Sequence, residues 1–485
     1  MSRIKLKDSD LLRQQALFAG RWQDARQGAT LPVIDPATGN TLVTIPALGT
    51  EETEQAIAYA DSVRIAWGKT PNAQRAALLE KWYQLIVENA DDLATIMTAE
   101  QGKPLAEAKG EVIYGASFVK WFAEEARRIY GDTIPAPSDD RRILVLKQPV
   151  GVAAAITPWN FPIAMITRKV APALAAGCPI IVKPSELTPL SALALAVLAE
   201  RAGFPSGVLQ VLTGLPGEIG AALTGSRTVR KISFTGSTRI GQLLMQQSAD
   251  SIKRLSLELG GNAPLIVFDD ADIDIAIAGV MTSKFRNAGQ TCVCANRILV
   301  QRGIYDRFAA RLLEEVAKLK VGDGFAPDST IGPLINDRAV EKVNSHIDDA
   351  LSLGATLLSG GIGPRNGTFV QPTVLGEVTS SMRIAHEETF GPVAPLFIFD
   401  DEQQAIAMAN DTPYGLGAYF FTENIRRAWR VAEALEFGMV GFNTGAISLE
   451  VAPFGGIKLS GIGREGSRYG IEEYLENKTF HMGSL

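Results

Sequence analysis

The sequence has few cysteines and histidines, and this scarcity excludes two kinds of site. Its 485 residues include only three cysteines, Cys178, Cys292 and Cys294, and three histidines, at positions 346, 386 and 481. Three cysteines are too few for a disulfide framework, so we expect a reducing compartment, the cytoplasm. Because no histidine lies near Cys292 and Cys294 in the sequence, no metal site is expected.

The sequence also lacks long apolar segments and runs of one charge sign. No apolar stretch reaches the roughly 20 residues of a membrane span, and residues 1–8 lack the apolar core of a signal peptide. The formal net charge of -6 arises from a mixed background, so neither a nucleic acid nor a membrane is expected as a partner. With 46% hydrophobic and 21% charged residues, the chain is typical of a folded protein of two or three domains.

The pattern of apolar residues predicts an α/β protein. Up to about residue 129 it is mostly helical, with a helix start at Thr50 and helical periodicity over residues 72–100. Residues 131–140 are rich in Gly, Pro and Asp and predict a loop, whereas residues 141–147 predict a strand. Residues 473–482 are compatible with an edge strand or an arm.

From residue 150 onward, short apolar strands alternate with helices. The expected strands are residues 151–157, 179–183, 208–213, 231–234 and 254–259, and the expected helices are residues 163–175, 188–202, 218–223 and 238–248. A second alternating region has strands at 265–268 and 297–300 and helices at 269–288, 305–319 and 339–353. Such alternation predicts parallel sheets that are covered by helices on both faces.

Cys292 lies in a predicted loop, within the run Phe-Arg-Asn-Ala-Gly-Gln-Thr-Cys that begins at Phe285. An isolated cysteine is more often a buried, inert residue than a nucleophile. A second run, Leu-Glu-Leu-Gly-Gly-Asn, carries Glu258. Because covalent catalysis on a carbonyl compound needs a nucleophile and a base, the two runs together favour such chemistry.

Three further runs follow predicted strands, where parallel sheets bind their ligands. Asn160, in Thr-Pro-Trp-Asn-Phe-Pro, is an uncharged donor suited to an oxyanion, although alone it is more typical of a turn. Lys183 and Glu186, in Val-Lys-Pro-Ser-Glu, are suited to a ribose or phosphate, or equally to a solvated loop. Gly236, in Ser-Phe-Thr-Gly-Ser, begins a helix and allows either close approach of a phosphate or a tight turn.

No Gly-x-Gly-x-x-Gly fingerprint stands at a strand-to-helix junction, so a dinucleotide would bind in a variant way. The runs described above, with Glu-Glu-Thr-Phe-Gly-Pro from Glu387 and Pro-Phe-Gly-Gly-Ile-Lys from Pro453, resemble the aldehyde dehydrogenase superfamily over nearly the whole chain. This resemblance implies a variant Rossmann cofactor domain, an α/β catalytic domain and a small β oligomerisation element. The expected boundaries are residues 1–130 and 150–258, residues 259–470, and residues 131–149 with 471–485.

The resemblance also implies a role for each matching residue. Cys292 is the expected nucleophile and Glu258 the general base, while Asn160 and the backbone N–H of Cys292 form the oxyanion hole. The expected cofactor, NAD or NADP with NAD preferred or both used, contacts Thr157, Trp159, Lys183, Ser185, Glu186, Gly236, Ser237, Glu388 and Phe390. The presence of Glu258 favours release of a free acid over transfer of the acyl group to coenzyme A.

Within the superfamily, the chain resembles the succinate-semialdehyde dehydrogenases, whose substrate ends in a carboxylate. The resemblance implies that Arg168, Arg286 and Ser448 bind this carboxylate and that Phe454 lines the pocket. Arg286 stands six residues before Cys292, in the last turn of the predicted helix, within reach of a substrate at the thiol. Two guanidiniums suit a carboxylate, but either arginine can instead make an ion pair within the protein.

Several alternatives remain open from the sequence. Glutarate semialdehyde, or ω-carboxy aldehydes in general, would suit the same arginines. A protein of this fold that only binds ligands is disfavoured, because Cys292, Glu258 and Asn160 are all present. Cys294 is either a passive thiol or a redox partner of Cys292. The family resemblance further implies a homo-oligomer, a dimer or a tetramer.

Overall fold

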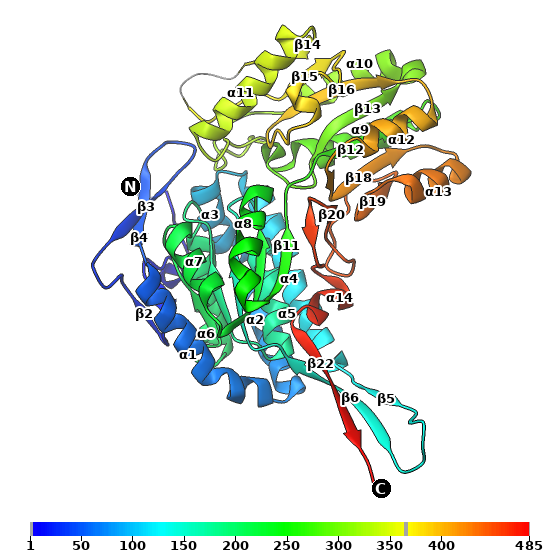
Figure 1. Ribbon diagram of the computed structural model, residues 1–485. Coiled ribbons are helices and arrows are strands. Elements are labelled where there is room, and N and C mark those ends of the chain that lie inside the picture. Colours follow the sequence, from blue (N-terminus) through cyan, green and yellow to red (C-terminus); the bar gives the residue numbers. More distant parts are fainter. Residues whose placement is uncertain (1–2, 363–366, 485) are drawn as a thin grey trace.

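The computed structural model describes residues 3–362 and 367–484. Two helix-covered sheets form separate layers, and a narrow three-stranded sheet projects from the first of them (Figure 1). No helix in the described part of the chain is long and apolar enough to cross a membrane.

The first sheet has eight strands in the order β2-β1-β9-β8-β7-β10-β11-β21. Its central strands are parallel, as predicted, and the antiparallel strands lie toward its edges. The bounds are β1 Ala16–Phe18, β2 Arg21–Gln23, β7 Val152–Ile156, β8 Ile180–Lys183, β9 Leu209–Val211, β10 Val229–Thr235, β11 Arg254–Glu258 and β21 Gly461–Ile462.

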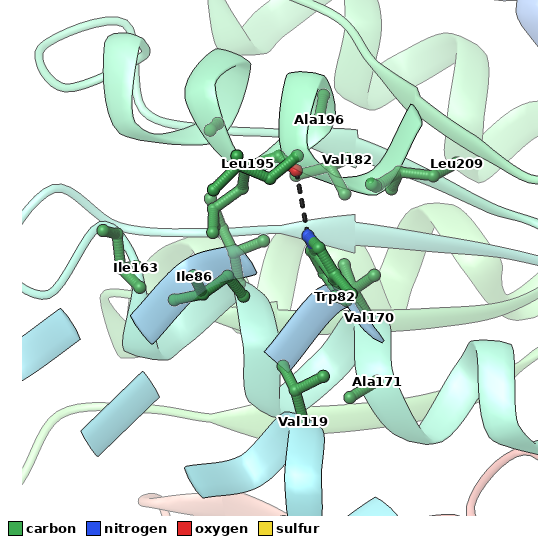
Figure 2. Close-up of a cluster of buried hydrophobic side chains, with 14 of the residues drawn as sticks. Trp82, Ile86, Val119, Ile163, Val170, Ala171, Val182, Leu195, Ala196 and Leu209 are labelled. Carbon is green, nitrogen blue, oxygen red and sulfur yellow. Dashed lines mark hydrogen bonds between the residues drawn. The ribbon is translucent and has the colours of Figure 1, made fainter. Parts of the chain in front are cut away.

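Helices cover both faces of this sheet and create two apolar cores. The bounds are α1 Thr50–Lys69, α2 Asn72–Glu88, α3 Ala90–Gln101, α4 Leu105–Glu125, α5 Ala164–Ala176, α6 Leu190–Ala202, α7 Pro216–Gly225 and α8 Thr238–Ser248. Helices α2 to α6 enclose the larger core, whereas α1, α7 and α8 enclose the smaller one. Figure 2 shows part of the larger core, where the indole N–H of Trp82 donates to the backbone oxygen of Leu195 at 3.1 Å.

The prediction of a mostly helical amino-terminal region is wrong for the first 46 residues. Besides β1 and β2, strands β3 (Thr30–Ile34) and β4 (Thr41–Pro46) form a two-stranded hairpin. Strand β1 is only three residues long and owes its place to pairing with β9, almost 200 residues away. Pairing at that separation leaves no local periodicity for sequence analysis to detect.

The second sheet has seven strands in the order β14-β15-β16-β13-β12-β18-β19. The strands are β12 Ala263–Val267, β13 Ala295–Gln301, β14 Thr356–Ser359, β15 Thr373–Gly376, β16 Val393–Phe399, β18 Gly417–Phe421 and β19 Met439–Phe442. The helices are α9 Ile273–Val280, α10 Tyr305–Val316, α11 Asp337–Ser352, α12 Glu402–Asn410 and α13 Ile425–Ala434. Helix α14, Ser467–Glu472, instead packs against α4 and α5 of the first unit. A third core fills this unit.

The predicted helix over residues 269–288 ends earlier than expected. Helix α9 stops at Val280, and a π-helical turn, Met281–Phe285, follows it. Arg286 then adopts an extended backbone (φ −54°, ψ 135°), and Asn287, Ala288 and Gly289 all have positive φ. Arg286 therefore lies beyond the α-helix, at the start of a short turn with left-handed residues, contrary to the prediction. Contacts from distant loops to Asn287 hold this irregular turn, and local propensity does not reveal them.

The projecting sheet consists of β22 (Leu475–Met482), β6 (Arg142–Pro149) and β5 (Asp132–Ile134). The arm expected at the carboxyl end is confirmed as β22, which pairs along all of β6. The loop predicted for residues 131–140 is wrong in part, because residues 132–134 pair with β6. Figure 1 shows that this sheet extends away from both helix-covered layers.

Candidate active site

Two cavities meet at Cys292, in the region between the two large sheets. The outer cavity, of about 360 Å³, is lined by residues from both units, including Asn160, Glu258, Cys292 and Glu388. The inner cavity, of about 20 Å³, is lined by Cys292, Arg168, Arg286 and Ser448 among others. A molecule that reacts at the sulfur can therefore extend into both spaces.

Asn160 reaches the site because it follows β7 at the carboxyl end of the first sheet. The residue is buried, and its side-chain amide donates to the backbone oxygen of Gln290 at 2.9 Å. Its side-chain oxygen has no hydrogen-bond partner among the described residues. The Asn160 side-chain amide therefore lies against the turn that leads to Cys292. Its second N–H remains free to bind an oxyanion.

Cys292 is half-buried in the loop before β13. Burial raises the pKa of its thiol to about 12, and the neighbouring Glu388 carboxylate adds to this shift. Arg168 and the backbone N–H of Cys292 itself oppose the shift. The sulfur is therefore a thiol in the free protein, and it needs a base or a bound cation to become a nucleophile.

Glu258 is the last residue of β11, and its side chain is 3% exposed. Neither carboxyl oxygen has a hydrogen-bond partner among the described residues, although both adjoin the outer cavity. Burial, together with the nearby Glu465, raises the pKa of Glu258 well above its usual range. A carboxyl group with a raised pKa and free oxygens is suited to take a proton from water.

The residues predicted to bind a dinucleotide fall into two groups. Trp159, Gly236, Ser237, Glu388 and Phe390 all line the outer cavity. The other four lie outside its lining: Thr157, Lys183, Ser185 and Glu186.

The first group fits a dinucleotide at two points. Gly236 precedes α8, whose N-cap residue, Ser237, makes no side-chain cap, so the N–H groups of the helix end are available to a phosphate. Glu388 borders the cavity, and among the described residues its carboxylate accepts a hydrogen bond only from the Gly261 N–H, at 3.4 Å. Burial raises the pKa of Glu388 to about 7, and a ribose hydroxyl would supply the missing donor.

The second group lies at the end of β8. The Lys183 ammonium is buried and donates to Glu186 at 3.1 Å. Burial lowers the pKa of Lys183, whereas Glu186 opposes this shift. Ser185 accepts the N–H of Leu187 at 3.2 Å, and the buried Thr157 hydroxyl has no partner among the described residues. These side chains form a compact polar corner beyond the outer cavity.

The two predicted substrate arginines differ in their surroundings. Arg168 is fully buried, lies 3.5 Å from Glu465, and binds the Tyr114 hydroxyl. Its Nε atom nevertheless has no acceptor in the described part of the chain. Arg286 is half-buried, rests on the Phe161 ring at 4.8 Å and makes no ion pair among the described residues. Arg286 is therefore the more available of the two for a substrate anion.

The remaining predicted residues are also placed. Ser448 lines the inner cavity, and the Phe454 ring lies 4.5 Å from the Arg168 guanidinium carbon. Cys294 is buried, and its sulfur donates to the backbone oxygen of Lys284 at 3.4 Å. Burial raises the pKa of the Cys294 thiol. A redox role for Cys294 stays a prediction, and all three cysteines are free thiols.

Three residues that shape the site were not predicted from the sequence: Tyr114, Lys169 and Glu465. Tyr114 lines the inner cavity and binds Arg168. Lys169 donates to Thr235 at 2.7 Å and pairs with Glu465, so a charged network surrounds Glu258. The only indication of this charged network in the sequence is that Lys169 directly follows Arg168.

Comparison with known proteins agrees with this geometry. The model of the aldehyde dehydrogenase family matches residues 22–480. A glutarate-semialdehyde dehydrogenase of Pseudomonas putida is 60% identical, over 98% of this chain and 99% of that protein. The NADP(+) succinate-semialdehyde dehydrogenase GabD of Escherichia coli is 59% identical, over 99% and 100%. A solved aldehyde dehydrogenase structure from Brucella melitensis has a TM-score of 0.98 and 61% identity, with 99% of each chain covered.

Proposed function

The chain belongs to the aldehyde dehydrogenase family, and on that premise we propose that it oxidises succinate semialdehyde to succinate with NAD(P)+. One observation carries the choice of substrate. Arg286, a half-buried guanidinium that makes no ion pair with any described residue, lines the inner cavity beside Cys292. The Glu107 carboxylate interacts with this cation electrostatically but forms no ion pair with it, so a guanidinium partly withdrawn from water favours a substrate that brings a carboxylate.

The proposed reaction begins at Cys292. Glu258 takes the proton of the Cys292 thiol and releases it to solvent, and the thiolate adds to the aldehyde carbon, while Asn160 and the Cys292 N–H bind the oxyanion that forms. NAD(P)+ supplies the hydride acceptor when it is bound. After hydride loss the acyl group stays on Cys292 as a thioester, and Glu258 takes a proton from the water that hydrolyses it. Arg286, Arg168 and Ser448 hold the distal carboxylate throughout.

The side chains of Lys183 and Glu186, at the end of β8, support use of NAD, or of both NAD and NADP. Glu186 accepts well from a free ribose hydroxyl and repels a phosphate. Lys183 lies 3.1 Å from Glu186 and offsets part of this repulsion, which leaves room for NADP. We assign residues 1–130 and 150–258 to the dinucleotide-binding domain and residues 259–470 to the catalytic domain. The projecting sheet, residues 131–149 with 471–485, is the proposed homo-oligomer contact.

Glutarate semialdehyde is the second candidate substrate. The relative from Pseudomonas putida carries that name, and the same arginines suit a carboxylate one methylene further away. Initial rates of aldehyde oxidation distinguish the two candidate substrates. The rates are measured with succinate semialdehyde, glutarate semialdehyde and an uncharged aldehyde of matched length, each with NAD and with NADP. We expect both carboxylated substrates to be strongly preferred.

The role proposed for Arg286 predicts the effect of Arg286→Ala. Loss of a charge-assisted contact raises KM for the carboxylated substrate by about 10- to 100-fold, and the uncharged aldehyde is affected little. Arg227→Ala, which removes an exposed arginine that pairs with no acid among the residues described, serves as the control and leaves both KM values unchanged. Equal turnover of the uncharged aldehyde by the wild type would overturn the proposed substrate, and no turnover of any aldehyde would favour a binding protein.

A further inference from the structure

A buried ionic cluster lies behind the proposed oxyanion hole and takes no part in the reaction described above. It consists of Lys103, just before α4, and of Glu107 and Glu111 on the first turns of α4. Lys103 is 2% exposed and Glu111 is 2% exposed, and the two form an ion pair. Removing so deeply buried a pair from water is costly, so a contribution to stability does not by itself explain its presence.

The cluster contacts the Asn160 segment from two directions. The Lys103 ammonium donates to the backbone oxygen of Asn160 at 2.8 Å. Glu111 accepts the N–H groups of Ile163 and Ala164 at 3.0 and 3.2 Å, where α5 begins. The backbone from the Asn160 carbonyl to the start of α5 is therefore held by one ion pair.

The same helix also contacts the segment that leads to Cys292. Glu107 stands one turn before Glu111, and its carboxylate accepts the N–H of Asn287 at 3.1 Å. The Asn287 side chain in turn donates to the Asn160 backbone oxygen at 3.0 Å and to Gln290 at 3.3 Å. Because Asn287 lies in the left-handed turn before the nucleophile, these bonds stabilise a backbone that local sequence does not favour.

We propose that Lys103, Glu107 and Glu111 act as positioning residues that set the distance between Asn160 and the Cys292 backbone. This inference rests on the proposed function, since those two groups are the expected oxyanion hole. The two donors come from different units of the protein, and α4 is the element that touches both loops. Oxyanion stabilisation depends steeply on donor position, so a displacement of about 1 Å lowers the rate by about 100-fold.

The first test is Lys103→Met, which removes the donor to Asn160 with little change in volume. We expect kcat to fall by about 10- to 100-fold, while KM for the cofactor stays within about threefold. The rate of Cys292 alkylation by iodoacetamide stays unchanged, because alkylation of a thiol forms no oxyanion. A loss of kcat accompanied by equally slow alkylation would overturn the proposal, because the nucleophile itself would then be disturbed.

A double variant separates positioning from stability. Lys103→Met alone leaves the Glu111 charge buried and unpaired, whereas Lys103→Met with Glu111→Gln removes that charge. We expect the double variant to regain much of the lost stability in urea unfolding, but not the lost kcat. Recovery of kcat together with stability would show that the pair is merely structural. Where Lys103→Met does not fold, Glu107→Ala tests the Asn287 side of the cluster by the same measurements.

A second buried lysine, whose glutamate partner is 27% exposed, provides the control. Lys231 is fully buried on β10, and its ammonium lies 3.0 Å from Glu473. Lys231→Met should lower stability without a selective loss of kcat, and an equal loss in both lysine variants would contradict the proposal. All rates use whichever aldehyde the wild type oxidises, so failure of the succinate semialdehyde assignment remains distinguishable from failure of this inference.

Discussion

At the scale of single residues, the surroundings of Cys292 keep it protonated until the reaction starts. Burial and the Glu388 carboxylate raise the pKa of the thiol to about 12, and Arg168 offsets only part of that shift. Glu258, with its own raised pKa and free oxygens, adjoins the same cavity. The free protein is thus protected from adventitious reactions, and the thiolate forms when the site is filled.

This protonation state predicts how alkylation of Cys292 depends on pH. Below a pKa of about 12 the thiolate fraction rises tenfold per pH unit, so the iodoacetamide rate of the free protein climbs with a slope near one from pH 7 to 9.5. Loss of activity reports the rate, and Cys292→Ser identifies any label on Cys178 or Cys294. A plateau near neutral pH would contradict the prediction, because it would mean an already ionised thiol.

Residues that stand in sequence runs were predictable, and residues that act through distant partners were not. Cys292 lies in a predicted loop, Glu258 within a predicted strand and Asn160 just after one, so pattern and family resemblance single them out as candidates. Lys103 is 57 positions from Asn160, whose backbone oxygen it binds. Glu465 is 296 positions from Lys169. Such contacts depend on the order of the strands in the sheet, which local sequence does not encode.

At the scale of elements, the alternation from residue 150 to residue 258 was predictable because short strands recur between helices, two of which end at a glycine. Helices α5 and α6 end at Gly177 and Gly203, both with positive φ. The segment after α9 was not predictable in this way. Its π-helical turn and its three left-handed residues depend on contacts with Glu107 and Asn160.

Gly289 provides a test of this strained segment. Its φ is +74°, and an added Cβ would lie 2.2 Å from the backbone oxygen of Gly391. We expect Gly289→Ala to destabilise the protein by about 2–5 kcal/mol, from left-handed strain and overpacking together, and to abolish most activity. Urea unfolding measures the change.

The control for this prediction is Gly110→Ala on α4. An added Cβ there meets nothing within 4 Å, so the variant should gain up to about 1 kcal/mol. Unchanged stability in Gly289→Ala would mean that the turn adopts another conformation in solution.

At the scale of the whole molecule, the proposed catalytic groups come from both large units. Asn160 and Glu258 follow strands of the first sheet, whereas Cys292 precedes β13 of the second. The site therefore exists only when the two sheets are held together. Helix α4 contributes to this, since its carboxylates contact loops of both units.

The projecting sheet leads to a prediction about assembly. Phe480 pairs with Leu144, and Leu146 lies two residues further along the same face, so three apolar side chains share one side of a thin sheet. Phe480 is 46% exposed and Leu146 is 41% exposed, although both belong to regular strands. An apolar face on an arm that leaves the body of the protein suits contact with a second copy of the chain.

We therefore expect the wild type to sediment as a dimer or tetramer at micromolar concentration, and Phe480→Asp to shift it toward the monomer. A carboxylate in an apolar contact is desolvated without a partner, which makes association weaker by several kcal/mol. Leu215→Asp replaces a leucine that is 57% exposed and lies away from the arm, and it should leave assembly unchanged. Sedimentation at several concentrations distinguishes these outcomes. A wild type that stays monomeric, or a Phe480→Asp protein that assembles normally, would mean that the arm is not the contact between subunits.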